Sequence, residues 1–582
     1  MHESLENFGV LSGGEMILQV LEQYGVEALF TSPIAALAPL WEAIAKRDLA
    51  RPGSTPAYYN CRHEVVAVSL AIGYYKATGK VAAVCLPTGL GVANGSMAMR
   101  TARQENIPML ILSPDTLTFG EDANNDPGPE WATFLVDDHG PAAHSALTTK
   151  WKIACRTNLD LVPNLHRALY FATQCPRGPV CVEIPFDVMM AANFDMVPNS
   201  RFPLAIKSDT LQASDAHIAE IAELIGGAQS PIIITEHFGC NPKAIKTLTL
   251  FAEKIGAPVF EWWMPSFQNI ARSHPLHAIA PVESVLETAD VIVVLCSHGP
   301  WHSPASPLRA GARVVVIDED PLRPKSAFWG YSTTDCVSGD PVANLSLILS
   351  HLHVPDSAAV SQRVAHWTAR NSQDKAKFES VAQVDADKAK AAGRVHASVF
   401  FSELSNALPS GSIVVDEMVA QVPLFTHFLF RDPAKSFVHL RGWQGGLGTG
   451  LGIALGAKVS NRDKTVVCIV GDGAFQYNPV PAALGFAQQY NCPILIAIMN
   501  NAGYVSQTWN FHRYFPTGSA LTSQNTLGNV ISPTPKYALL AQVWGGLGLE
   551  VSDEASLKTA LKQSAGPGLM SQVLLLDVSV SP

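Results

Sequence analysis

The sequence lacks the features that mark several large classes of protein. No uninterrupted apolar segment reaches about 18 residues, the length of a membrane-spanning helix, and the start, "MHESLENFGVLSGGEM", has no basic stretch followed by an apolar one. Charged residues make up only 15% of the chain, with a formal net charge of -10 and no cluster of lysine and arginine. Nucleic acid and anionic membranes need a concentrated positive patch, so we expect neither as a partner. These absences predict a soluble, cytoplasmic protein whose ligands are small molecules.

Paired cysteines for metal binding or redox exchange are also missing. The 10 cysteines are scattered, and no two form a CxxC pair that could hold zinc or exchange disulfides. Several lie inside apolar runs such as "VVCIV" and "VVLCS". We therefore expect buried, reduced thiols that pack as small hydrophobic side chains.

The chain is long and rich in apolar residues. The chain has 582 residues, several times the usual length of one domain, and 47% of them are hydrophobic. Such a chain can bury several separate cores and hide further surface between subunits. We therefore expect several domains and an oligomer.

Short runs rich in β-branched residues alternate with helix-length segments along nearly the whole chain. "KVAAVCL", "DVIVVLC" and "TVVCIV" are examples. Continuous apolar strands separated by helices are typical of parallel sheets covered on both faces. The expected fold class is therefore α/β, with doubly wound parallel sheets in each of three domains. The predicted domain ranges are 1–190, 200–350 and 393–582, with a linker at 351–392.

The strongest local signal is "VVCIVGDGAFQ", followed one helix and one strand later by "IAIMNNAGY". Asp472 and Asn501 each come just after a buried strand, at the edge where parallel sheets hold their ligands. With the carbonyl of Gly503, their oxygens suit Mg²⁺, which prefers oxygen ligands and commonly binds together with phosphates. Backbone N–H groups at Gly473 and Ala474 would face a diphosphate. Either motif alone is typical of an ordinary turn, but the pair indicates a metal and diphosphate site.

This pair of motifs resembles the thiamine-diphosphate signature. The three-unit arrangement is similar, over essentially the whole chain, to the superfamily of pyruvate decarboxylase, acetolactate synthase and benzoylformate decarboxylase. The resemblance implies a first domain that binds the aminopyrimidine of the cofactor and a third that binds its diphosphate and Mg²⁺. It implies a Rossmann-like central domain between them, which in some relatives holds FAD or ADP.

The resemblance also implies a catalytic role for Glu64 in "YNCRHEVVAVSL". In the family, a glutamate that opens a helix of the first domain contacts N1′ of an aminopyrimidine bound by the neighbouring subunit. A carboxylate there favours the imino tautomer, whose N4′ takes the proton from C2 of the thiazolium and leaves an ylide. The ordinary alternative is a first-turn glutamate that stabilises the helix dipole. Arg62 and His63 have no role in this hypothesis.

Further cofactor contacts are implied by the resemblance. The glycine-rich segment "HLRGWQGGLGTGLGIALGAK" is similar to the family's loop in which an apolar residue wedges between the two cofactor rings. By position, Leu447 is that residue, and the carbonyl of Gly445 would accept a hydrogen bond from N4′–H. The segment "DEMVAQ" matches a loop whose backbone contacts the diphosphate, which adds Val419 to the cofactor-binding residues.

The sequence gives weaker signals for the residues that would contact the substrate. Pro87 and Thr88 stand where some relatives carry a histidine beside the reacting carbon. His298 and His302 follow a strand of the middle domain, and His302 falls near a proton-moving histidine of benzoylformate decarboxylase. We take His302 as a candidate proton shuttle, and an ordinary loop histidine remains the alternative. The segment "YVSQTWNFHRYF" is expected to form a helix over the active site, with pocket candidates Ser506, Gln507 and Trp509.

The resemblance implies an enzyme that makes or breaks the carbon–carbon bond next to a carbonyl. We favour a benzoylformate-decarboxylase-like 2-oxo acid decarboxylase or lyase that works through an ylide and an enamine, because of the "GGLG" segment and the histidine after the middle strand. An acetolactate-synthase-like carboligase is the main alternative, although "FLVDDHGPAAH" lacks that family's Phe-Gln-Glu element. An acyl-CoA lyase and a non-catalytic relative are further alternatives.

The expected ligands are thiamine diphosphate, Mg²⁺ and a small 2-oxo acid or 2-hydroxy ketone. Residues 260–281 carry no clear flavin signature, so the sequence does not support FAD in the central domain. FAD stays open as an alternative because the family's contacts to it are too diffuse for this segment to decide. Because the family builds its active sites between subunits, we expect a homodimer or a homotetramer.

Overall fold

The computed structural model describes most of the chain. The described residues are 11–121, 123–126, 128–135, 139–191, 211–261, 265–324, 326, 330–430, 432, 437–442, 446–564 and 571–581. Within these ranges, every helix is too short or too polar to cross a membrane.

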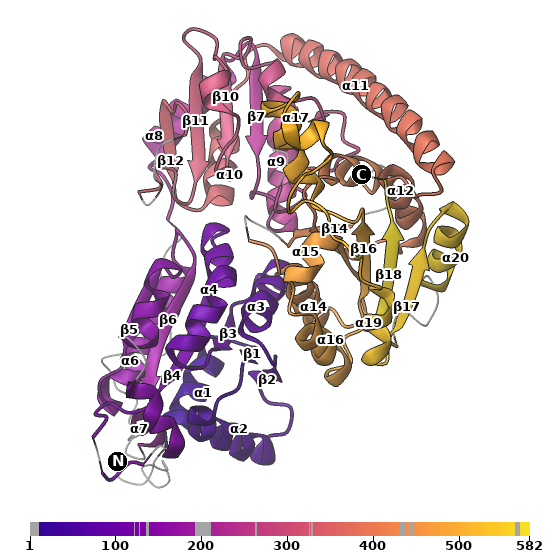
Figure 1. The fold of residues 1–582 in the computed structure, drawn as a ribbon. Coiled ribbons are helices and arrows are strands. Elements are labelled where there is room, and N and C mark those ends of the chain that lie inside the picture. The colour runs from indigo at the N-terminus through magenta and orange to yellow at the C-terminus, as the bar shows by residue number, and fades with distance from the viewer. Residues whose placement is uncertain are drawn as a thin grey trace. The chain divides into compact units, whose positions relative to one another are not determined.

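The chain divides into two compact units. The first comprises residues 1–209, 444–462 and 478–492, and the second comprises 210–443, 463–477 and 493–582. One six-stranded sheet lies in the first unit and two lie in the second, and all the strand pairs in them are parallel. Helices flank each sheet (Figure 1), which confirms the α/β fold class with three parallel sheets.

The first sheet has buried residues on both of its faces. Leu29 belongs to the core that the helices α1 (Gly13–Gln23), α2 (Ala38–Ala50) and α6 (Asn158–Thr173) share with the strands. Its neighbour Phe30 stacks on Tyr59 and meets Tyr74 of α3 (Glu64–Thr78). Since side chains alternate along a strand, this places helices against both faces, as the continuous apolar runs predicted. The strands, in sheet order, are β2 (Ala57–Asn60), β1 (Ala28–Thr31), β3 (Ala82–Cys85), β4 (Met109–Asp115), β6 (Pro179–Pro185) and β5 (Trp151–Ala154).

Two helices of the first unit pack unusually closely. An added Cβ at Gly73 of α3 would lie 2.0 Å from the carbonyl oxygen of Ile453, and one at Gly456 of α14 would lie 2.1 Å from that of Leu70. Only glycine permits this backbone approach, so the glycine-rich segment brings α14 against α3. The helices of this unit are α1 (Gly13–Gln23), α2 (Ala38–Ala50), α3 (Glu64–Thr78), α4 (Thr88–Gln104), α5 (Gly140–His144), α6 (Asn158–Thr173), α7 (Phe186–Met190), α14 (Gly450–Ser460) and α16 (Val480–Gln489).

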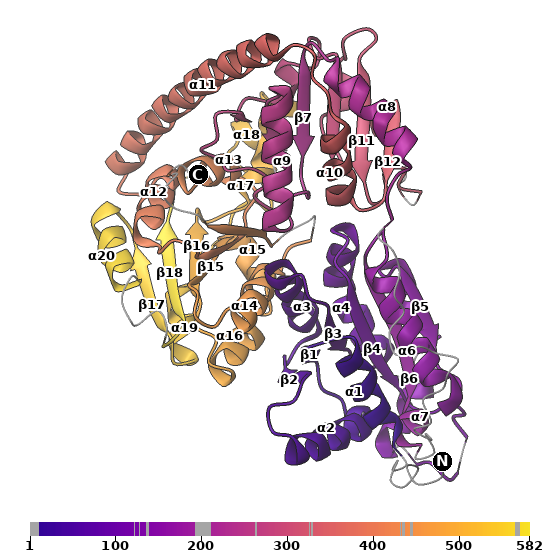
Figure 2. The same cartoon turned by 180° about the vertical axis from the view of Figure 1, so that it is seen from behind.

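The central sheet lies in the second unit, and its core is rich in isoleucine and valine. Figure 2 shows it from behind, with α8, α9 and α10 beside its strands. Its strands, in sheet order, are β12 (Asp335–Ser338), β11 (Arg313–Asp318), β10 (Val291–Leu295), β7 (Pro231–Thr235), β8 (Val259–Glu261) and β9 (His277–Ala278). The helices that accompany it are α8 (Asp215–Gly226), α9 (Pro242–Ile255) and α10 (Pro341–His351). The stretch predicted as a linker contains α11 (Ser357–Ala391), a single helix of 35 residues.

The third sheet repeats the strand-order pattern of the first. Its strands, in sheet order, are β14 (Val438–Arg441), β13 (Ile413–Glu417), β15 (Val466–Gly471), β16 (Leu495–Asn500), β18 (Leu574–Ser579) and β17 (Leu547–Val551). The remaining helices of the second unit are α12 (Ala397–Ala407), α13 (Val422–Phe428), α15 (Asp472–Tyr477), α17 (Val505–Tyr514), α18 (Ser519–Thr522), α19 (Ala538–Val543) and α20 (Glu554–Ser564).

The cysteines are free thiols, and most are buried, as expected. Burial raises the pKa of Cys181 and of Cys85 to about 12, which keeps both thiols protonated and inert at neutral pH. Cys240 differs from the expectation because it is exposed.

Candidate active site

The two halves of the strongest sequence motif meet at the carboxyl edge of the third sheet. Strands β15 and β16 pair in parallel with Gly471 opposite Met499, so the residues that come after each strand emerge side by side. Asp472 is the first residue of α15, and Asn501 directly succeeds the end of β16. This is the arrangement that the spacing of the motifs predicted.

One backbone N–H group donates hydrogen bonds to both predicted side-chain metal ligands. The N–H of Gly503 donates both to Oδ2 of Asp472 and to Oδ1 of Asn501, each at 3.1 Å. Both side-chain oxygens therefore lie within reach of a single point. Ala502 adopts a left-handed backbone conformation with φ of 60°, which turns the chain so that the N–H of Gly503 faces back toward Asp472.

The carboxylate of Asp472 is suited to a cation. It is only 1% exposed, and burial raises its pKa to about 6 even though it accepts backbone hydrogen bonds from Gly473 and Gly503. Within the described ranges, no lysine or arginine forms an ion pair with it. The buried carboxylate of Asp472 and the half-buried amide of Asn501, at the ends of two neighbouring strands, together offer oxygen atoms that fit Mg²⁺.

The packing of the site leaves no room for a Cβ at Gly473 unless Tyr504 moves. An added Cβ there would lie 2.5 Å from Cε1 of Tyr504, far closer than atoms can approach without movement. The N–H of Gly473 donates to the Asp472 carboxylate at 2.9 Å, and Ala474 is buried in the same first turn of α15. Tyr504 was not singled out from the sequence, because nothing in the local pattern shows which side chain covers the glycine.

Glu64 begins α3 in the first unit, and both of its carboxylate oxygens are held. The hydroxyl of Ser32 donates to Oε1 at 2.9 Å, and the side-chain amide of Asn94 donates to Oε2. The side chain is 15% exposed, so it retains some access to a ligand. Sequence reasoning missed Ser32 and Asn94. The one sequence signal was that Ser32 directly follows the apolar strand β1. That β1 lies next to β2, the strand before Glu64, is visible only in the sheet.

The structure explains the two residues that the sequence hypothesis left without a role. His63 is the N-cap of α3, and its Nδ1 accepts a hydrogen bond from the N–H of Val65 at 3.2 Å. Arg62 has a left-handed backbone, with φ of 62°, and its guanidinium donates to the side chain of Gln489 at 2.8 Å. Both residues therefore fix the start of the helix that carries Glu64.

The structure describes only some of the other residues that were predicted to contact the cofactor. Leu447 is half-buried in the first unit, between Gly446 and the start of α14, and Gly445 lies outside the described residues. Val419 is half-buried in the loop after β13. In the same segment, Asp416 pairs with Arg441 at 2.7 Å and with His439 at 2.5 Å.

The side chains of Asp416, His439 and Arg441 form a buried network. Burial by itself would raise the pKa of Asp416, but Arg441 and His439 outweigh this and hold it below the ordinary value. Burial lowers the pKa of His439 to about 4, although Asp416 opposes that shift. The network anchors the end of β14 to β13 and so supports the loop that carries Val419.

The substrate-side candidates lie mainly at the surface. His302 is exposed and stands just before a short 3-10 turn. Thr88 is buried at the start of α4, after Pro87, and has a left-handed φ of 39°. The segment after Gly503 does form a helix, α17, and its Trp509 is 45% exposed. Ser506 is half-buried and Gln507 is exposed.

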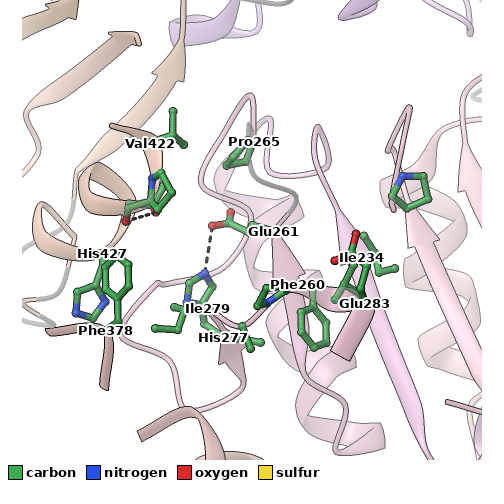
Figure 3. A pocket seen from close by; sticks show the side chains of 17 residues that line it. Ile234, Phe260, Glu261, Pro265, His277, Ile279, Glu283, Phe378, Val422 and His427 are labelled. Carbon is green, nitrogen blue, oxygen red and sulfur yellow. Dashed lines mark hydrogen bonds and ion pairs between the residues drawn. The ribbon is translucent and has the colours of Figure 1, made fainter. Parts of the chain in front are cut away.

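A cavity of about 370 Å³ lies in the second unit. Figure 3 shows Glu261 and His277 facing each other across part of its wall, and their ion-pair distance is 3.3 Å. The segment 260–281 therefore contributes to the wall of this cavity. None of Asp472, Asn501 and Gly503 lines this cavity, so it is separate from the predicted metal site. The lining residues are Ile234, Phe260, Glu261, Pro265, His277, Ala278, Ile279, Ala280, Pro281, Val282, Glu283, Pro300, Phe378, Val422, Pro423, Thr426 and His427.

Three family models match this chain along most of its length. They are the N-terminal thiamine pyrophosphate (TPP) binding domain at residues 11–123, the central domain at 218–328 and the C-terminal TPP binding domain at 419–578, all of the thiamine pyrophosphate enzymes. The order of the three matches is the order of the three sheets.

Known proteins are similar over nearly the full chain. The catalytic subunit of mitochondrial acetolactate synthase from Aspergillus candidus is 26% identical over 99% of this chain and 82% of its own length. The acetolactate synthase large subunit of Haemophilus influenzae is 25% identical over 98% of this chain and 94% of its own.

A solved structure shares the fold. The thiamine diphosphate-dependent 4-hydroxybenzoylformate decarboxylase of Rhodococcus jostii RHA1 superposes with a TM-score of 0.77 at 20% identity, and the match covers 98% of this chain and 99% of that one. Together with the three domain matches, this shows that the chain belongs to the thiamine pyrophosphate enzyme family, whose members are decarboxylases or carboligases.

Proposed function

We propose that this protein breaks the carbon–carbon bond next to the carbonyl of a 2-oxo acid and releases CO2, with thiamine diphosphate and Mg²⁺ bound. The observation that supports this most directly is the shared N–H of Gly503, which holds Asp472 and Asn501 together after two adjacent strands. When bound, thiamine diphosphate supplies a carbanion that attacks a carbonyl carbon and then accepts the electron pair that CO2 leaves behind.

Asp472, Asn501 and the carbonyl of Gly503 would hold Mg²⁺ through oxygen atoms. The buried carboxylate supplies the negative charge, and the backbone hydrogen bonds from Gly473 and Gly503 fix its orientation. Backbone N–H groups at Gly473 and Ala474, in the first turn of α15, would orient the diphosphate, with the N–H of Gly473 turning from the Asp472 carboxylate to which it donates here. Leu447, Gly445 and Val419 complete the proposed contacts to the cofactor.

Glu64 would exchange a proton with N1′ of the aminopyrimidine. Hydrogen bonds from Ser32 and Asn94 hold its two oxygens, so the carboxylate has one defined orientation. A general base or acid must be fixed within hydrogen-bond reach of the proton that it moves. The cap made by His63 fixes the backbone at the same point.

His302 is the proposed proton donor for the product. Its exposure lets it exchange protons with solvent, and histidine is the side chain best suited to proton transfer near neutral pH. Protonation and then release gives an aldehyde, which is the decarboxylase outcome.

Carboligation is the second candidate. The relatives from Aspergillus candidus and Haemophilus influenzae are acetolactate synthases, at 25–26% identity, and this supports attack on a second carbonyl in place of protonation. The two candidates share the release of CO2 and differ in whether the rest of the substrate takes up a proton or is joined to a second carbonyl compound.

We also propose a homodimer or homotetramer, because 47% of the residues are hydrophobic and family members build active sites between subunits. Sedimentation analysis of the active protein tests this, and a fully active monomer would contradict it.

The function is tested with purified protein, thiamine diphosphate and Mg²⁺ against a panel of 2-oxo acids, each with and without an acceptor aldehyde. CO2 together with an aldehyde supports the decarboxylase, and CO2 together with a 2-hydroxy ketone or a 2-hydroxy-3-oxo acid supports the carboligase. Cofactor binding by calorimetry serves as the control. Binding of the cofactor without CO2 release from any member of the panel would contradict both.

A further inference from the structure

A second cluster of candidate metal ligands lies at the carboxyl edge of the central sheet. Strands β7 and β10 are neighbours there, with Thr235 opposite Leu295. Glu236 and His237 come directly after β7, and His298 comes after β10 with two residues between. In Figure 1 the two strands stand side by side, so parallel pairing alone brings these three side chains to one edge.

The three side chains converge on one point. Nε2 of His237 lies 2.8 Å from Nδ1 of His298 and 3.2 Å from Oε1 of Glu236. Nδ1 of His298 is 3.9 Å from Oε2 of Glu236, and one ligand atom from each residue lies within 4.8 Å of the others. With bonds of about 2.0–2.2 Å, neighbouring ligand atoms of a tetrahedral zinc ion lie about 3.3–3.5 Å apart. The two separations at Nε2 of His237, 2.8 Å and 3.2 Å, are slightly shorter than that value, so a bound ion would require the side chains to move slightly apart.

The surrounding hydrogen bonds orient the side chains of this cluster. Nδ1 of His237 lies 2.8 Å from the hydroxyl of Ser266, which orients the ring with Nε2 toward the cluster. Oε2 of Glu236 accepts from the N–H of His298 at 2.9 Å and from the hydroxyl of Ser297 at 3.3 Å. Oε1 is therefore the oxygen that faces His237. Partners of this kind, behind the ligands, orient metal-binding side chains in proteins.

Charge and access also suit a cation. The side chain of Glu236 is 3% exposed and that of His237 is 11% exposed, whereas the His298 side chain is 44% exposed. The site is thus buried on one side and open to solvent on the other. The nearby positive charge of Arg323 is paired with Asp318 at 3.1 Å, so the cluster keeps the negative charge of Glu236.

We propose that Glu236, His237 and His298 bind a divalent transition-metal ion of the zinc type, with solvent or a small ligand in the fourth position. Two imidazole nitrogens together with one carboxylate oxygen are a donor set that such ions prefer, whereas Mg²⁺ prefers oxygen ligands alone. The site goes beyond the proposed function, because it shares no residue with the Asp472 cluster. Its ion would tie the ends of β7 and β10 together.

Titration with Co²⁺ tests the proposal, because four-coordinate Co²⁺ has characteristic visible absorption and Zn²⁺ displaces it. The full-length protein is used without thiamine diphosphate and with excess Mg²⁺ present to occupy the Asp472 site. The variants are His298→Ala, Glu236→Gln and Ser266→Ala. The control is His353→Ala, which removes an exposed histidine elsewhere in the same unit.

We expect one Co²⁺ per chain in the parent and in His353→Ala, with four-coordinate absorption that Zn²⁺ abolishes. The affinity should fall at least about tenfold in His298→Ala, Glu236→Gln and Ser266→Ala. Because His298 is partly exposed, we expect His298→Ala to fold even if the substitution of the buried Glu236 prevents folding. A parent that binds no Co²⁺, or a His298→Ala variant that binds it as tightly as the parent, would show that the cluster is only a hydrogen-bonded pair of histidines beside a glutamate.

Discussion

The backbone N–H of Gly503 donates to the carboxylate of Asp472 at 3.1 Å, although the two residues come after different strands. The same N–H reaches the amide oxygen of Asn501. Because β15 and β16 are adjacent and parallel, this hydrogen bond links the two loops that follow them at the carboxyl edge of the third sheet. The linked loops surround the buried carboxylate of Asp472. Substitutions at that edge and at Glu64 test the two halves of the proposed cofactor site separately.

Replacing Glu64 by glutamine should lower kcat for CO2 release at least about 100-fold, because the amide cannot exchange a proton with N1′. The glutamine side chain still offers an oxygen and a nitrogen to Ser32 and Asn94, so the fold should be retained. Glu42→Gln, on an exposed face of α2, is the matched control and should leave kcat unchanged. Full activity of Glu64→Gln would remove Glu64 from the mechanism.

Removing the metal should abolish CO2 release, and added Mg²⁺ should restore it in the parent. In Asp472→Asn the restoration should fail, because an amide oxygen without charge binds Mg²⁺ far more weakly. Calorimetry of thiamine diphosphate binding with and without Mg²⁺ reports the same loss without a turnover assay. Asp463→Asn, an exposed position before β15, is the control. Equal Mg²⁺ dependence in parent and Asp472→Asn would place the metal elsewhere.

Gly473→Ala should destabilise the cofactor-free protein by about 1–3 kcal/mol, as overpacking usually does. The new methyl group would lie 2.5 Å from the ring of Tyr504. Gly471→Ala is a close control, because a Cβ there meets nothing within 4 Å. The midpoint of thermal unfolding should therefore fall in Gly473→Ala and hardly change in Gly471→Ala. The opposite ranking would mean that Tyr504 moves aside freely.

The stability of the protein should fall as the pH drops from about 6.5 toward about 4, in part through His439. Burial lowers the pKa of the folded side chain to about 4, whereas the unfolded side chain keeps the ordinary value. Between these values the unfolded chain binds the extra proton, so acid favours unfolding, and below the folded pKa the loss is complete.

Thermal midpoints at about pH 7 and about pH 5 measure this effect. His439→Gln should lose less stability between the two than the parent, since glutamine can still donate to Asp416 but does not titrate. His353→Gln, at an exposed site, should lose as much as the parent. Identical losses in His439→Gln and the parent would show that other groups account for the acid sensitivity.

The sequence by itself determined the three parallel sheets and the positions of Asp472, Asn501 and Glu64 on their elements. Apolar strands separated by helices are a local pattern, and a residue that comes directly after such a strand must emerge at its carboxyl edge. Family motifs then supplied the chemistry. These inferences needed no knowledge of which strands are neighbours.

Only the tertiary structure decided which side chains surround those residues. Ser32 and Asn94 hold Glu64, and Tyr504 covers Gly473, because strand order and helix packing bring together segments that are distant in the chain. The same holds for Glu236 and His298, which meet since β7 and β10 pair. Hydrogen-bond partners depend on three-dimensional proximity, which local periodicity does not encode.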